Sequence, residues 1–237
     1  SIIVIRHNRK VENKTKTHSI AKKIILGIII TVLIITAIFS IIVFYEATMM
    51  PNMIAYKPII YLYPTDDIEL SVKLGYEDKI TCSYPQYTTS WNVLAKTSSD
   101  LIDLNTNRTL YALYYESEAV YDFEIQKDGF IVKGSDITKF LEEKLEILGL
   151  TERETEEFIV YWLPILQENE YNYIRFATTE EINQNMPLEF SVQPDTLIRV
   201  LMTYKGLDKP IDVEEQQLET PERTGFVAVE WGGTEIK

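Results

Sequence analysis

The chain has 237 residues, with 36 Asp or Glu and 23 Lys or Arg, and this charge is unevenly distributed. Two of the acids and seven of the bases precede Ala47, which leaves 34 acids and 16 bases in the remainder. So acidic a region argues against nucleic acid as a partner, because neutralising phosphates requires Lys and Arg. The single cysteine, Cys82, excludes an internal disulfide. We expect Cys82 to be a buried, small apolar residue in a strand, with a reactive or intermolecular thiol as the alternative.

Residues 24–45 contain no charged side chain. As a helix they would extend about 33 Å, close to the ~30 Å hydrocarbon core of a bilayer. A buried helix of a globular protein would have a polar face, which this run lacks. A cleaved signal peptide would have a shorter apolar region that ends at a small-residue cleavage site. The pattern therefore predicts an uncleaved transmembrane helix at 24–45.

The flanking charges predict how this helix is oriented. Seven Lys or Arg and one acid, Glu12, precede the apolar run, whereas Glu46 follows it directly. Basic flanks stay on the cytoplasmic side. We therefore expect a single-pass protein of the cell membrane, with a basic cytoplasmic tail at 1–23, a connector at 46–56 and an extracytoplasmic domain at 57–237.

The first half of that domain has the patterns of β-strands. Pro58 and Pro64 enclose five large uncharged residues, "IIYLY", which predicts a short strand at 59–63 buried on both faces. Apolar and polar residues alternate over 68–74, a half-buried strand that we expect to pair with 80–85 across a turn. Further strands are predicted at 91–97, 108–117 and 129–134.

The middle of the domain changes to helical spacing. Apolar residues recur every three or four positions over 137–148, with Ser135 as the expected N-cap and Gly149 just beyond the C-terminus. Thr151 and Glu154 form a capping-box pattern for a second helix that begins near Glu152. We expect this helix to end near 158 and an extended run to follow, because Pro164 would end or kink a helix.

The last part of the chain again has strand patterns. Strands are predicted at 171–179, 188–192, 196–207 and 226–233, with a short one within 211–217 and one helical turn capped by Thr179. On the last long strand, Val227, Val229 and Trp231 should share one face and Ala228 and Glu230 the other. The glycines at 232 and 233 would allow a sharp turn. The predicted fold class is α+β, β-rich with two central helices.

Three stretches resemble one known family. "KPIIYLYP" at 57–64, "FIVYWLPIL" at 158–166 and "GFVAVEWGGTEIK" at 225–237 are similar to segments of a family of uncharacterised bacterial proteins, mostly from Gram-positive anaerobes. The resemblance covers about residues 57–237. It implies no activity, ligand or catalytic residue.

Few residues of the domain could carry chemistry. Both histidines, His7 and His18, precede the apolar run, which excludes Cys/His zinc sites and Ser/His/Asp or Cys/His catalysis from the domain. No motif indicates a metal or a cofactor. Paired carboxylates could hydrolyse a glycan. The candidates are Glu116 and Glu118, with Asp122, Glu124 and Glu230 as others.

Aromatic residues are the more distinctive feature, since amphipathic rings pack against sugars and proteins. Tyr114 and Tyr115 are adjacent in a strand, so at most one of them can be a core residue. The candidate binding residues are Tyr87, Trp91, Tyr114, Tyr115, Glu116 and Trp231, although the same rings could simply build a core. We expect a non-catalytic module that binds cell-wall glycan or an envelope protein. The alternatives are a carboxylate-dependent cell-envelope glycoside hydrolase and a structural subunit of a membrane complex.

Overall fold

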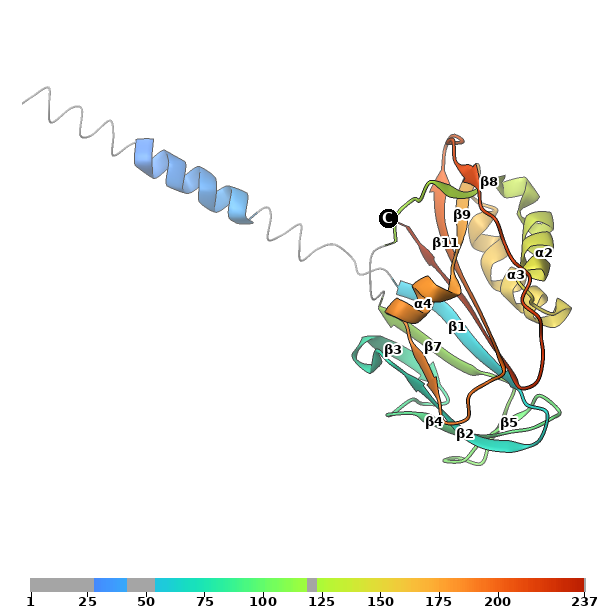
Figure 1. Ribbon diagram of the computed structural model, residues 1–237. Helices are drawn as coiled ribbons and strands as arrows, with labels where there is room; N and C mark the ends of the chain where they lie inside the picture. The colour runs from blue at the N-terminus through green and yellow to red at the C-terminus, as the bar shows by residue number, and fades with distance from the viewer. Residues whose placement is uncertain (1–27, 42–53, 119–122, 237) are drawn as a thin grey trace, which may run out of the picture. The chain divides into compact units, whose positions relative to one another are not determined.

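The computed structural model describes residues 28–41, 54–118 and 123–236, and divides the chain into two compact units, Ser1–Pro51 and Asn52–Lys237 (Figure 1). In the first unit, residues 28–41 are helical and exposed. They are part of the transmembrane segment predicted at 24–45. The rest of that segment, the predicted tail at 1–23 and most of the predicted connector lie outside the described residues. Among the residues that are described, no helix is both long and apolar enough to cross a membrane.

The second unit contains two sheets, which confirms a β-rich α+β fold (Figure 1). The large sheet has the strand order β12-β8-β9-β11-β13-β1-β7-β3, and the small sheet has the order β10-β2-β4-β5-β6. The strands are β1 (Ile54–Tyr63), β2 (Ile68–Leu74), β3 (Ile80–Tyr84), β4 (Trp91–Ala95), β5 (Leu101–Asp103), β6 (Thr109–Leu110), β7 (Leu113–Glu118), β8 (Asp128–Lys133), β9 (Tyr171–Ala177), β10 (Leu188–Phe190), β11 (Thr196–Leu207), β12 (Glu214–Glu215) and β13 (Val227–Glu235). The helices are α2 (Ile137–Ile147), α3 (Glu152–Leu166) and α4 (Thr179–Asn185), with 3-10 turns at Glu77–Lys79 and Gly134–Asp136.

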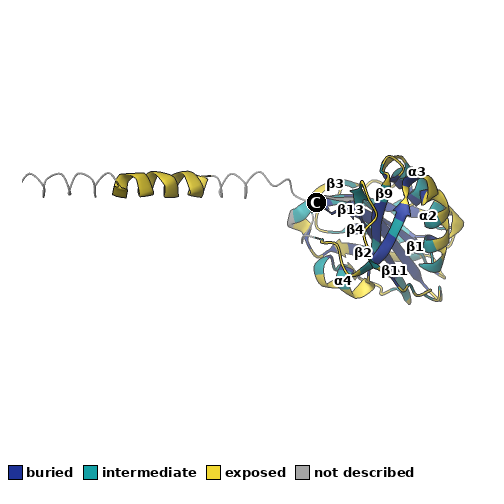
Figure 2. Cartoon of the chain, turned by 90° about the horizontal axis from the view of Figure 1, so that it is seen from above, coloured by how far each residue is buried: buried dark blue, intermediate teal, exposed yellow. Residues whose placement is uncertain are grey.

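The large sheet is the middle of three layers. On one face, Tyr61, Val229 and Trp231 pack with α2 and α3 in one hydrophobic core. On the other face, Leu62 and Ala228 pack with the small sheet in a second core. This confirms the predicted division of the last strand into two faces. In Figure 2 the strands of the large sheet are mainly dark blue, the colour of buried residues.

Strand β1 contains the "IIYLY" stretch and lies inside the large sheet, paired with β13 on one side and β7 on the other. Residues Ile59 to Leu62 are at most 3% exposed, which confirms burial on both faces. The strand begins earlier than predicted, at Ile54, so the end of the predicted connector is strand. Pro58 does not end the strand: it lies where the register with both neighbours shifts, next to Lys57 with φ 52°. A bulge of this kind accommodates a residue without an N–H.

Three predictions about strand partners and ends are wrong. Strand β3 pairs with β7 rather than with β2, whose partners are β4 and β10. The predicted strand at 108–117 is two strands, β6 and β7, in different sheets. Gly232 and Gly233 do not make a turn but continue β13, where they pair with Leu201 and Met202 of β11. Glycine is required at 233 because a Cβ there would lie 2.5 Å from the Trp162 ring.

The helix ends agree in part with the prediction. The capping box of Thr151 and Glu154 is confirmed, and Gly149 has the expected positive φ of 84°. The N-caps of α2 and α4 are Asp136 and Thr178, one residue away from the expected Ser135 and Thr179.

Helix α3 does not end near 158 but continues through Pro164 to Leu166. Phe158, Trp162 and Leu166 recur every four residues and are all fully buried, so packing holds this face helical. The proline removes the N–H that would bond to Val160, which is 68% exposed and therefore open to water.

Candidate functional site

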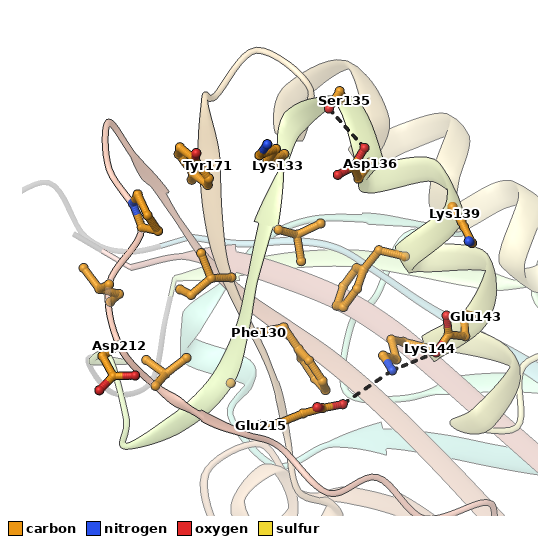
Figure 3. Close-up of a pocket in the computed structure, with 17 residues that line it drawn as sticks. Phe130, Lys133, Ser135, Asp136, Lys139, Glu143, Lys144, Tyr171, Asp212 and Glu215 are labelled. Atoms are coloured by element: carbon orange, nitrogen blue, oxygen red, sulfur yellow. Dashed lines mark hydrogen bonds and ion pairs between the residues drawn. The ribbon is translucent and has the colours of Figure 1, made fainter.

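A cleft of about 1000 Å³ lies between β8, α2 and the segment 210–215 (Figure 3). We call it the β8–α2 cleft. Its floor is β8, and one wall is the side of α2 that carries Lys139, Phe140 and Glu143. The opposite wall is formed by Tyr171 and residues 210–213.

Local sequence explains why the helix lies beside the strand. Phe130 and Val132 are buried against the helices. Ile131 lies between them on β8 and is only half-buried, and because side chains alternate along a strand it faces the other side of the sheet. The 3-10 turn at Gly134–Asp136 then connects β8 directly to α2. A glycine is required at 134, because a Cβ there would lie 2.3 Å from the Asn169 carbonyl oxygen. Strand β8 therefore ends and α2 begins at the turn Gly134–Asp136, and the two elements separate from there.

The outer edge of β8 is only partly paired. On its inner side, Phe130 to Lys133 pair antiparallel with β9. On its outer side, β12 pairs only with Asp128 and Gly129, through hydrogen bonds such as Gln216 N–H to the Gly129 carbonyl at 3.2 Å. Over the part of the chain described here, no strand pairs with the outer edge of residues 130–133.

Charged groups close the lower end of the cleft. The Lys144 ammonium donates to Glu143 at 2.9 Å, lies 3.9 Å from Glu215 and sits 5.2 Å from the centre of the Phe130 ring (Figure 3). The hydrogen bond from Lys144, followed by its positive charge, lowers the pKa of the Glu143 carboxyl. Phe140 meets Phe130 edge to face, with ring centres 5.2 Å apart. The floor is therefore apolar and its aromatic faces are already in contact with protein groups.

The upper end is more open. Lys133, Ser135, Asp136 and Lys139 are all exposed there, and Ser135 donates to Asp136 at 3.1 Å (Figure 3). Both walls carry charged groups. In total the cleft is lined by the carboxylates of Asp136, Glu143, Asp212 and Glu215 and by the ammonium groups of Lys133, Lys139 and Lys144.

None of the six candidate binding residues from the sequence lines this cleft. Trp91, Tyr115 and Trp231 are at most 1% exposed, so they are core residues and not part of an exposed aromatic face. Trp91 and Tyr115 lie between the two sheets, where Tyr87 packs edge-on against Trp91 at 4.8 Å. Trp231 packs against Phe158 on the helical side.

Tyr114 and Glu116 are half-buried on the outer face of β7, opposite the core residue Tyr115. This confirms that only one of the two adjacent tyrosines is in the core. Cys82 lies beside them, with its Sγ 3.6 Å from the Tyr114 hydroxyl, and it is exposed rather than buried as predicted. The reason is that β3 is the last strand of the large sheet and this face of it is uncovered.

Glu230, which the sequence suggested as part of a pocket, is buried in an ion pair. Its carboxylate accepts from Arg199 Nε at 2.6 Å and from the Tyr115 hydroxyl at 2.7 Å, and the Tyr76 hydroxyl lies 2.5 Å from that of Tyr115. Burial opposes a charged Arg199, but Glu230, Tyr115 and Tyr76 together outweigh it and raise the arginine pKa. Burial is also the main reason that the pKa of Tyr115 is raised well above its usual value. Arg199 also donates to Asn183 and to the Met186 carbonyl, so the network ties α4 to the large sheet.

The sequence carried one overlooked signal for the cleft. "GFIVKGSDITKF" at 129–140 passes from strand to helix without a loop and holds two lysines beside large apolar residues. The opposite wall comes from residues about 80 positions further along the chain, which no local pattern indicates. Comparisons with protein-family models, curated proteins and solved structures each returned no match for the chain.

Proposed function

We propose that the second unit is a non-catalytic binding domain that holds a polypeptide segment of another envelope protein in the β8–α2 cleft. The observation that carries this proposal is an open cleft of about 1000 Å³ with an apolar floor, beside an edge of β8 that no strand among the described residues pairs with over 130–133. Ligand sites are typically concave and apolar, with a few polar groups at the rim, and reach about this volume.

The floor suits a polypeptide better than a glycan. Sugars stack on the exposed flat face of an aromatic ring. Phe130 is only 8% exposed, and its ring is in contact with Lys144 and Phe140. The strand edge, in contrast, presents main-chain groups that another main chain can bond.

The carboxylate-dependent hydrolase is less well supported. Glu230 is engaged by Arg199 and Tyr115 in the interior, and Glu116 lies on β7, away from the cleft. Of the candidate carboxylates that the structure describes, Glu116, Glu118, Glu124 and Glu230, none lines the β8–α2 cleft.

The uncharged run at 24–45 and its basic flank support a place for this domain on the outer side of the cell membrane. The domain would then meet segments of other envelope proteins. The proposal therefore includes attachment of the chain to the membrane through residues 24–45.

A peptide library tests the proposed function. Random octapeptides displayed on phage would be selected on the immobilised full chain, and the enriched peptides would be titrated against wild type, Phe140→Ala and Glu142→Ala. Phe140 lines the cleft, whereas Glu142 is exposed on the same helix and does not. We expect Phe140→Ala to weaken binding about tenfold or more and Glu142→Ala to leave it unchanged.

Three results would overturn the proposal: no enriched peptide, equal binding by Phe140→Ala and wild type, or saturable binding of purified cell-wall glycan that Phe140→Ala abolishes. The thermal unfolding midpoint of each variant controls for folding, since Phe140 also packs against the core.

A further inference from the structure

We infer that the bound polypeptide forms an additional β-strand on the outer edge of β8 and that it is a basic segment with apolar side chains at alternate positions. This inference rests on the proposed function and names the binding mode and the chemistry of the partner.

The direction of the backbone groups on β8 supports strand addition. The Gly129 carbonyl accepts from Gln216 on the outer side, whereas the Gly134 N–H donates to the Glu170 carbonyl on the inner side. Successive residues of a strand alternate between the two neighbours. The N–H and carbonyl of Ile131, and the N–H of Lys133, therefore face the cleft.

The chain itself already uses this edge. Strand β12 adds to β8 in parallel at Asp128 and Gly129 and then leaves it, and the Gln216 side chain turns away to bond both backbone groups of Phe176, at 3.0 and 2.7 Å. The edge thus accepts a strand at one end, and at the other end no strand in the described part of the chain pairs with it. Recognition by strand addition combines main-chain hydrogen bonds with side-chain sites on both sides of the added strand.

The walls determine which side chains fit. Alternate side chains of an added strand point to opposite faces of the sheet. On the α2 side they would meet Phe140 above the buried Phe130 and Val132, and on the other side they would meet Ile131 and Ile211. Both sets of contacts favour apolar side chains near the edge.

Charge complementarity indicates a basic partner. The cleft is lined by four carboxylates and three ammonium groups, one negative charge in excess, and Lys144 contacts two of the four carboxylates, those of Glu143 and Glu215. The larger contribution comes from the whole domain. The chain from Ala47 onward holds 34 acids and 16 bases, so its field attracts cations over a long range. An acidic segment, and an anionic wall polymer, would be repelled by the same field.

The test uses the octapeptide that the library selection enriches most, with each of its backbone amides methylated in turn. A strand on β8 bonds through alternate amides only. We therefore expect methylation to weaken binding about tenfold at every second position and to have little effect between them. Raising the salt concentration from about 0.05 M to about 0.5 M should also weaken the wild-type complex, because it screens the attraction.

Hydrogen exchange on the full chain gives an independent measurement. The Ile131 and Lys133 amides should become protected when the peptide binds, whereas the Phe130 and Val132 amides, already bonded to β9, should change little. Binding that is sensitive to Phe140→Ala but lacks the two-residue alternation would refute strand addition and leave the proposed function standing. Selection of acidic peptides, or affinity that does not fall with salt, would refute the basic partner, and failure to enrich any peptide would refute both.

Discussion

Replacing Glu230 by Gln should strongly destabilise the second unit. The change leaves the Arg199 guanidinium, whose side chain is 0% exposed, without its anion, which is itself only 6% exposed. Removing one partner of a buried ion pair costs about 3–5 kcal/mol. Because Gln keeps the shape and one accepting oxygen for the Tyr115 hydroxyl, we expect a loss near the lower end, about 3 kcal/mol.

Urea unfolding followed by tryptophan fluorescence measures this loss, since Trp91, Trp162 and Trp231 are all buried and report on both cores. Glu235→Gln is the matched control, because Glu235 is exposed on the same strand; it should stay within about 0.5 kcal/mol of wild type. A free energy of unfolding for Glu230→Gln within about 1 kcal/mol of wild type would refute the reasoning. Such a result would mean that the pair is solvated or rearranges at low cost.

Three further changes test other parts of the account. Gly233→Ala would place a Cβ 2.5 Å from the Trp162 ring, and should lower the unfolding free energy by about 2–3 kcal/mol; an unchanged urea midpoint would contradict the close packing of β13 on α3. Thr151→Ala removes the side chain that caps α3 and should cost about 1 kcal/mol by the same assay, whereas no loss would mean that the cap contributes nothing. Burial opposes ionisation of Glu181, but hydrogen bonds from Thr178 and Arg175 outweigh it and lower its pKa below 4.5. The stabilisation from this lowered pKa is present above pH 4.5 and is lost as the pH falls from there through the folded-state pKa. Glu181→Gln should therefore lose less stability on acidification than wild type. Equal losses in the two proteins would contradict this assignment.

Local sequence patterns predicted the elements whose contacts are close in the sequence, and the strand that is buried on both faces. The alternation over 68–74 became β2, and the capping box at Thr151 begins α3 as expected. The stretch at 59–63 was predicted as doubly buried because its residues are large and uncharged, and β1 does lie between two cores. In each case a few neighbouring residues contain the physical information.

The partners of strands and the exposure of aromatic residues could not be predicted in this way. Nothing in the sequence around Trp91 or Tyr115 shows that a second sheet covers them. An aromatic residue on the surface and one in the core can be flanked by the same alternating pattern of polar and apolar residues. Pro164 alone predicts that the helix ends early. The tertiary packing of Trp162 and Leu166 instead extends α3 to Leu166. The β8–α2 cleft could not be predicted for the same reason, because it joins residues 129–144 with 210–215 through the order of strands in the large sheet.

The most direct test of the account is a crystal structure of the full chain with the peptide that the library selection enriches most. The account predicts an extended peptide between β8 and α2, hydrogen-bonded to the backbone of Ile131 and Lys133, with an apolar side chain on Phe140. A peptide bound elsewhere, for example on the outer face of β7 beside Tyr114, would contradict the central claim that the β8–α2 cleft is the binding site.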